Sequence, residues 1–223
     1  MGSTLLKSSG EAVYKLGGVS RETVERLQIY VDLVLKWQPA QNLIAPSTIP
    51  DIWTRHVVDS LQTKRTLPEA KTWVDIGSGA GFPGVVTAIL QADDLDGHVH
   101  MIESNQRKAA FLRTALRETG SRGTVHPGRI ESVAKSWTHG PVDAVSARAL
   151  ASLDLLLDLS EPFTTQGSVC VFHKGQDFQR EVNEASHTWT FDMVEKKSIV
   201  DPSSRMLVLS KVSRRLSQEG VGS

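Results

Sequence analysis

From Lys71 onward, short apolar runs alternate with segments of helical periodicity, and this alternation restricts the possible folds more than any other feature. Apolar and β-branched runs predict strands, and the stretches between them predict helices. Such alternation is typical of an α/β fold with a mostly parallel sheet covered by helices on both faces. We expect strands over 72–76, 99–103, 124–126, 142–147, 168–173 and 205–212, with 190–200 as a seventh candidate. We expect helices over 84–91, 106–119, 130–137, 150–160 and 177–187.

Two more helices are predicted ahead of the sheet, and together they suggest a small N-terminal helical extension over 20–66. Ser20 can cap the first helix, whose apolar residues recur at helical spacing as far as Leu35. Pro39 is expected to end that helix, because proline lacks the N–H that a helix interior needs. The second helix is expected over 50–61. The predicted organisation is then a flexible lead-in (1–19), the extension, a sheet domain (67–213) and a tail (214–223).

The charge balance excludes a protein that binds nucleic acid by bulk attraction. The 223 residues contain 25 Lys and Arg against 25 Asp and Glu. The charges are unevenly placed, however. The stretch 104–130 contains six basic residues and one acid, Glu118, so a local basic patch on the surface is possible.

Other classes of protein are excluded by single features of the composition. The one cysteine, Cys170, rules out an internal disulfide and a cysteine-based metal site, and we expect no metal. No apolar run approaches the roughly 20 residues of a membrane span, and the N-terminus lacks the apolar core of a signal peptide. We therefore expect a cytoplasmic protein without a membrane partner, and a monomer.

The segment 75–84, Asp-Ile-Gly-Ser-Gly-Ala-Gly-Phe-Pro-Gly, follows the first expected strand of the sheet and opens a helix. Glycines here let the backbone approach a ligand closely, at the strand ends where parallel sheets bind ligands. Gly79, Gly81 and Gly84 have the G-x-G-x-x-G spacing of a dinucleotide loop, but they lie a few residues late. An acidic residue followed by G-x-G-x-G is instead the form that binds S-adenosylmethionine (SAM), and we favour it. Its members here are Asp75, Gly77, Gly79 and Gly81.

Residues at or just after the ends of the next three strands also suit a bound nucleoside. Glu103 ends the second strand, where a carboxylate can accept hydrogen bonds from two ribose hydroxyls. Ile130 and Glu131 follow the third strand, in the loop that would cover an adenine ring. Arg148 ends the fourth and offers a planar donor fork suited to a carboxylate, a phosphate or a guanine edge.

These local patterns leave three functions open. An adenosine ribose occurs in both SAM and NAD, so the chain suits a SAM-dependent RNA methyltransferase, an NAD-dependent oxidoreductase or a non-catalytic nucleoside-binding protein. The fourth strand end, Ser146 to Leu150, lacks the Asn/Asp-Pro-Pro-aromatic motif of enzymes that methylate exocyclic amines. Methylation at carbon 5 would need a cysteine nucleophile in a loop, and Cys170 lies in an apolar run.

Several longer motifs together resemble the glucose-inhibited division protein B family. They are Asn42-Leu43, the Arg-His-Val-Val-Asp-Ser-Leu run over 55–61, the 75–84 loop, Ser146 to Leu150, and Lys174-Gly175. They stand in the family's order and spacing, and the resemblance extends over about 27–212. It implies a Rossmann-like SAM-dependent methyltransferase that modifies N7 of a guanine in 16S ribosomal RNA, at position 527 in the 530 loop. The implied partner is 16S rRNA or the assembling small ribosomal subunit.

The resemblance also implies roles for individual residues. The family's SAM contacts correspond to Gly77, Phe82, Ile130, Glu131 and Arg148, and the acid after the second strand corresponds to Glu103.

Other matched positions concern the RNA. Arg55, His56 and Lys174 are expected to line its entrance. The chain departs from the family at Gln38, where asparagine is common, and at His173, where proline is common. Guanine N7 carries a lone pair and no proton, so no general base is required. We expect Arg148 to have an orienting role, through the cofactor carboxylate or the RNA backbone.

Overall fold

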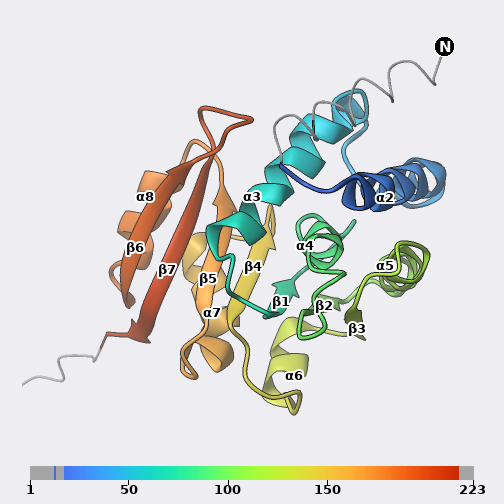
Figure 1. Cartoon of the computed structure of the whole chain (residues 1–223). Coiled ribbons are helices and arrows are strands. Elements are labelled where there is room, and N and C mark those ends of the chain that lie inside the picture. The colour runs from blue at the N-terminus through green and yellow to red at the C-terminus, as the bar shows by residue number, and fades with distance from the viewer. Residues whose placement is uncertain (1–12, 14–17, 216–223) are drawn as a thin grey trace, which may run out of the picture.

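The computed structural model describes residue 13 and residues 18–215, which include a seven-stranded sheet flanked by helices (Figure 1). The strands are β1 (Thr72–Ile76), β2 (His98–Glu103), β3 (Gly123–Pro127), β4 (Ala144–Arg148), β5 (Val169–Lys174), β6 (Trp189–Lys197) and β7 (Arg205–Arg214). The α-helices are α2 (Arg21–Gln41), α3 (Asp59–Thr66), α4 (Gly84–Leu90), α5 (Gln106–Glu118), α6 (Ile130–Lys135), α7 (Leu153–Thr164) and α8 (Phe178–Ala185). A 3₁₀ turn, η1 (Pro46–Thr48), and a π-helix, η2 (Trp53–Val58), connect α2 to α3.

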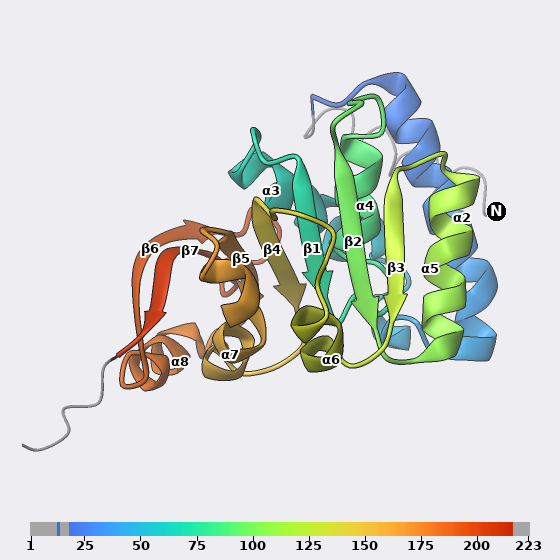
Figure 2. The ribbon, with the colours of Figure 1, turned by 90° about the horizontal axis from the view of Figure 1, so that it is seen from below.

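The strand order is β3-β2-β1-β4-β5-β7-β6 (Figure 2). Strands β1 to β5 pair in parallel, whereas β7 runs antiparallel to both of its neighbours, β5 and β6. The expected seven-stranded, mostly parallel sheet with helices on both faces is therefore confirmed, and the candidate run 190–200 corresponds to β6. The carboxyl ends of β1, β2, β3 and β4 meet at one edge, where a ligand site is expected.

Successive residues of the central strands face opposite sides of the sheet, as the pleat requires. Trp73 packs in a core with α2, α4 and α5, whereas Val74 packs in a second core with α7 and α8. Both side chains are fully buried. Burial on both faces explains why the strands appear in the sequence as nearly continuous apolar runs.

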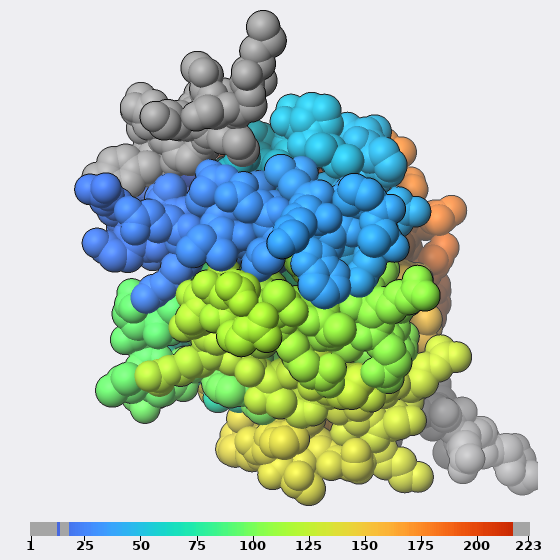
Figure 3. Space-filling model, turned by 90° about the vertical axis from the view of Figure 1, so that its right-hand side faces the viewer, coloured from blue at the N-terminus to red at the C-terminus, as the bar shows by residue number. Residues whose placement is uncertain are grey.

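The N-terminal helix α2 lies across α5 on the surface of the molecule (Figure 3). The prediction that Pro39 ends this helix is wrong, because α2 continues to Gln41 and Asn42 takes the left-handed conformation after it. A proline this close to the end removes only its own hydrogen bond, which the helix tolerates. Gln38 secures the end: its Oε1 accepts from the Ile44 N–H at 3.0 Å, and its Nε2 donates to Ile44 O at 2.8 Å.

The second expected helix, over 50–61, is longer and less regular than predicted. It begins as the π-helix η2 and continues as α3 to Thr66. The prediction stopped one turn early because the last turn of α3 is polar. Beyond this turn, Lys64 Nζ donates to Ala70 O at 2.5 Å.

The predicted boundaries near the two ends of the chain are described in part. Strand β7 continues to Arg214, one residue past the expected end of the sheet domain. Most of the predicted lead-in (1–19) and of the tail (214–223) lies outside the described residues. Among the helices that the structure describes, none is long and apolar enough to span a membrane.

Candidate functional site

A cavity of about 800 Å³ opens at the carboxyl ends of the parallel strands. Its walls come from the glycine loop after β1, the end of β2, the turn into α6, the segment after β4, the η1–η2 region and the β6–β7 loop. It brings together several of the predicted site residues, namely Gly77, Gly79, Phe82, Glu103, Ile130, Glu131 and Arg148.

The glycine loop turns sharply through backbone conformations that only glycine adopts readily. Gly77 and Gly79 have positive φ angles of 65° and 57°. The Gly79 N–H donates to Glu103 Oε2 at 2.8 Å, and the Asn105 N–H donates to Glu103 Oε1 at 2.7 Å. The Glu103 carboxylate therefore fixes the loop and still has lone pairs free for a ligand in the cavity.

Asp75 and Gly81 lie beneath this loop and are not among the described residues that line the cavity. Asp75 is 1% exposed, and Ser146 Oγ donates to its Oδ1 at 2.7 Å. Burial raises the pKa of the Asp75 carboxyl to about 6. At Gly81, a Cβ would overlap the Val85 side chain. In this structure both residues serve the packing of the loop, and their direct contact with the cofactor stays a prediction.

The opposite wall of the cavity is the turn between β3 and α6. The Gly128 N–H donates to Glu103 O at 3.1 Å, which ties this turn to the end of β2. Ile130 is partly buried against the second core and Glu131 is exposed at the start of α6. Both line the cavity, as a loop that covers an adenine ring should.

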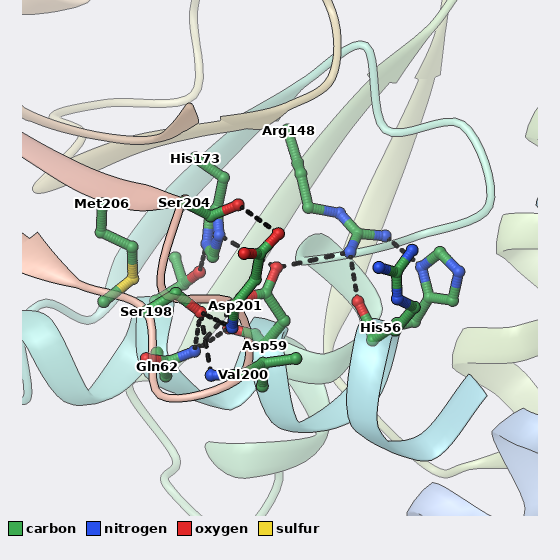
Figure 4. Close-up of polar contacts among 12 residues, drawn as sticks. His56, Asp59, Gln62, Arg148, His173, Ser198, Val200, Asp201, Ser204 and Met206 are labelled. Carbon is green, nitrogen blue, oxygen red and sulfur yellow. Dashed lines mark hydrogen bonds and ion pairs between the residues drawn. The ribbon is translucent and has the colours of Figure 1, made fainter. Parts of the chain in front are cut away.

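Arg148 lies at the end of β4 and connects this cavity to the η2 region (Figure 4). Its Nη1 donates to Arg55 O at 3.0 Å, and its Nη2 lies 2.6 Å from His56 Nδ1. Its guanidinium also lies 3.6 Å from Asp59 Oδ2 and over the Phe82 ring, 5.3 Å from the centroid. The Arg-His-x-x-Asp part of the family motif therefore surrounds the Arg148 side chain.

The contacts of His56 define its protonation. Burial and the Arg148 charge lower the pKa of His56 to about 4, so the ring is neutral at pH 7. Arginine can only donate, so Nδ1 accepts from Arg148 and the ring proton lies on Nε2. That proton is donated to Thr48 Oγ1 at 2.8 Å.

Known proteins that resemble this chain identify the family to which it belongs. The family described as GidB, rRNA small subunit methyltransferase G, matches residues 23–208. The chain belongs to this family. It is 50% identical over 200 residues to the ribosomal RNA small subunit methyltransferase G of Rhizobium meliloti (strain 1021), covering 88% of this chain and 93% of that protein. It is also 50% identical to the ribosomal RNA small subunit methyltransferase G of Sinorhizobium fredii (strain NBRC 101917 / NGR234), over 88% of this chain and 92% of that protein.

More distant solved structures share the fold. The O-methyltransferase TomG from Streptomyces achromogenes, in complex with SAM, aligns with a TM-score of 0.56 at 16% identity, over 83% of this chain and 89% of that one. An O-methyltransferase from Bacillus cereus in complex with SAH aligns with a TM-score of 0.54 at 13% identity, over 95% and 100%.

Membership in the rRNA small subunit methyltransferase G family decides among the three functions that the sequence left open. The chain is a SAM-dependent methyltransferase, so neither the NAD-dependent oxidoreductase nor the non-catalytic nucleoside-binding protein applies. The dinucleotide spacing from Gly79 to Gly84 has separate structural causes. Gly79 has a positive φ angle, and a Cβ at Gly84 would lie 2.6 Å from Asp75 Oδ2.

The three residues expected at the RNA entrance of this methyltransferase differ in how far they are exposed. Arg55 is exposed and lines the cavity, and His56 lies deeper in its wall. Lys174 is buried, and its Nζ donates to Ala151 O at 2.7 Å and pairs with Glu181 Oε2 at 2.5 Å. In this structure Lys174 fixes the segment after β4 and does not present its charge at the entrance.

Sequence reasoning missed the contribution of two remote segments. The Tyr30 hydroxyl of α2 donates to Ala80 O at 2.6 Å and so supports the glycine loop from the N-terminal extension. Val200, Asp201 and Ser204 of the β6–β7 loop line the far end of the cavity. Neither segment carries a local motif that signals such a position.

No group of three or more His, Cys, Asp or Glu side chains within the described residues is arranged to hold a metal ion.

Proposed function

We propose that this protein transfers the methyl group of SAM to N7 of a guanine in 16S rRNA, the guanine at position 527 of the 530 loop. The observation that carries the proposal is the cavity in which Glu103, the glycine loop and Arg148 meet. We further propose that the enzyme works as a monomer in the cytoplasm, on 16S rRNA or the assembling small subunit.

The cavity has features that suit SAM. At Gly79, a Cβ would meet nothing closer than Gly77 O at 3.8 Å, so a ligand can approach this backbone. Glu103 keeps acceptor capacity for the two ribose hydroxyls, and Ile130 and Glu131 line the cavity and are proposed to cover the adenine. These acceptors and this backbone surface suit the adenosyl group of SAM.

Methyl transfer to guanine N7 requires correct orientation of the two reactants and no proton transfer by the protein. Bound SAM supplies an electrophilic methyl group on a sulfonium, and guanine N7 has an in-plane lone pair and no proton to lose. The two ring nitrogens of His56 are both engaged, with Arg148 and with Thr48. This histidine therefore does not serve as a base, and the site holds the two reactants in line.

Charge moves from the sulfonium to the guanine ring during transfer, so a free cation beside N7 would oppose the reaction. Arg148 is paired with Asp59 and bonded to Arg55 O, and its fork is held at the cavity wall. We assign Arg148 an orienting contact with the cofactor carboxylate or an RNA phosphate.

Basic residues from η2, from α5 and from the turn before α6 border the cavity. Arg55, Lys108 and Arg129 line it, and Arg107 is exposed on the same first turn of α5. These charges suit phosphates of a folded RNA, and RNA affinity should fall as salt rises.

A transfer assay tests the proposal. Small subunits from a strain that lacks the modification are incubated with the protein and labelled SAM, and the rRNA is digested and examined by mass spectrometry. We expect one 7-methylguanosine per subunit, and a strong loss of product with Arg148→Ala but not with Glu118→Gln. Calorimetry should detect binding of SAM and not of NAD. Methyl transfer to another base, or no transfer at all, would contradict the proposal.

A further inference from the structure

Asp59, the first residue of α3, is the point where four segments of the chain are connected (Figure 4). Its Oδ1 accepts from Ser198 Oγ at 3.1 Å and from Gln62 Nε2 at 3.2 Å. Its Oδ2 faces His173 Nδ1 at 3.3 Å and Arg148 Nη1 at 3.6 Å. The carboxylate therefore links the β6–β7 loop and β5 to the arginine at the cavity.

His173 supports this carboxylate from inside the protein. It stands on β5 opposite Arg148 of β4 in the parallel register, and its side chain is only 8% exposed. Its second ring nitrogen, Nε2, lies 2.7 Å from Thr63 Oγ1 of α3. Burial works to raise the pKa of Asp59, but the hydrogen bond with His173 and the charge of Arg148 outweigh it and lower that pKa. The carboxylate thus stays charged in a partly buried place.

The sequence of contacts Asp59–His173–Thr63 resembles the acid, base and nucleophile of a hydrolase triad. Thr63 is fully buried and is not among the described cavity-lining residues, so its hydroxyl cannot reach a substrate. The members of the network that line the cavity are instead Asp59 and Arg148, and of the two Arg148 carries the donor groups. The arrangement is therefore built to hold a group in place.

We infer that His173 is a positioning residue for methyl transfer, which acts through Asp59 to hold the Arg148 guanidinium at the cavity wall. Two of the Arg148 contacts, with Arg55 O and His56 Nδ1, are to neutral groups, and Asp59 is the anion that it meets. Without the His173 bond, the Asp59 carboxylate loses a donor and can rotate away from the arginine. The inference rests on the proposed function, because Arg148 must act on the cofactor or the RNA.

Two matched variants separate the two bonds that His173 makes. In His173→Asn the amide nitrogen can take the place of Nδ1 and donate to Asp59. In His173→Gln the amide nitrogen reaches the place of Nε2, so the bond to Thr63 is kept and the bond to Asp59 is lost. We expect kcat/KM of His173→Gln to fall about tenfold, the size of one hydrogen bond to a charged group, and His173→Asn to stay within about twofold of wild type.

Combining His173→Gln with Arg148→Ala shows whether the loss of kcat/KM depends on the arginine. In the Arg148→Ala background, His173→Gln should cause no further loss, because the group that it positions is gone. An equal loss in both backgrounds, or a wild-type kcat/KM for His173→Gln alone, would overturn the inference. Should His173→Gln fail to give cooperative urea unfolding, Asp59→Asn cuts the same link from the other side and should show the same loss.

Failure of the proposed function has a different signature. The wild-type protein would then transfer no methyl group to small-subunit rRNA. In that case the side-chain Nε–H resonance of Arg148 still tests the inference, since this resonance should shift and broaden in His173→Gln and match wild type in His173→Asn. An unchanged resonance in His173→Gln would show that His173 does not position the arginine.

Discussion

The Glu103 carboxylate accepts a hydrogen bond from the backbone N–H of Gly79, with 2.8 Å between the two heavy atoms. This contact joins the end of β2 to the glycine loop that follows β1. The side chain expected to bind the cofactor ribose thus also fixes the loop against which the cofactor would lie. One substitution should therefore disturb both.

Replacing Glu103 with glutamine should weaken SAM binding by about 10- to 100-fold, which corresponds to the loss of a charge-assisted hydrogen bond. The new amide cannot accept from Gly79 and Asn105 with both of its groups, because one of them is a donor. Calorimetry of SAM binding measures the effect. Glu118→Gln, on the exposed surface of α5, is the matched control and should bind SAM as wild type does. Equal affinities for Glu103→Gln and the control would contradict this role.

Two glycines with similar backbone angles should respond differently to alanine. Gly81 (φ 93°) and Gly140 (φ 85°) both have left-handed conformations, which cost a side chain about 1–2 kcal/mol. A Cβ at Gly140 meets nothing within 4 Å, whereas one at Gly81 overlaps Val85 and crowds the Tyr30 hydroxyl. Gly81→Ala should lose about 1–3 kcal/mol more of the free energy of unfolding than Gly140→Ala. Urea denaturation compares them, and equal losses would show that the packing under the loop is less tight than described.

A cluster of histidines around His100 of β2 and His126 of β3 should make stability depend on pH. His100 Nδ1 lies 3.0 Å from His126 Nε2, and the rings of His98 and His139 lie within 5.1 Å of the His100 ring, centroid to centroid. Burial lowers the pKa of His100 to about 3, and burial also lowers the pKa values of His98 and His126. The folded rings stay neutral where the unfolded chain takes up protons, so the free energy of unfolding should fall as pH drops below about 6.5.

Replacing His100 with phenylalanine should flatten this dependence by up to about 1.4 kcal/mol per pH unit between pH 6 and 4. Urea unfolding at a series of pH values measures the slope. If the slope stays at its wild-type value in His100→Phe, the ring is not held neutral by the fold.

Cys170 should be inert in the folded protein and reactive on unfolding. It is fully buried in β5, and burial raises the pKa of its thiol to about 12. Because it is the one cysteine of the chain, a thiol-reactive dye reports on this site alone. The native protein should react only at the rate of its unfolding, and full reaction in denaturant serves as the control. Rapid native labelling would place the thiol at the surface.

The fold and much of the site follow from local patterns in the sequence. Alternating strands and helices predict the sheet, and strand ends locate Glu103, Ile130 and Arg148 on one cavity. The end of α2 was misjudged, because a Gln38 side-chain clamp on Ile44 lets the helix run past a proline.

Side-chain burial decides the placement of two other residues in the predicted motifs. Asp75 and Lys174 belong to motifs of the cofactor and RNA sites, yet both are buried with hydrogen-bond partners. Those partners, Ser146 for one and Ala151 with Glu181 for the other, are adjacent only after folding. A sequence pattern can locate such residues near a site without showing which way their side chains point.

Mass spectrometry of 16S rRNA from a strain in which this gene is deleted tests the central claim most directly. We expect the deletion to remove one 7-methylguanosine from the 530 loop and leave every other modification in place. The wild-type gene should restore it, and a gene with Glu103→Gln should restore it much more slowly. An rRNA that keeps this 7-methylguanosine in the deletion strain would contradict the account.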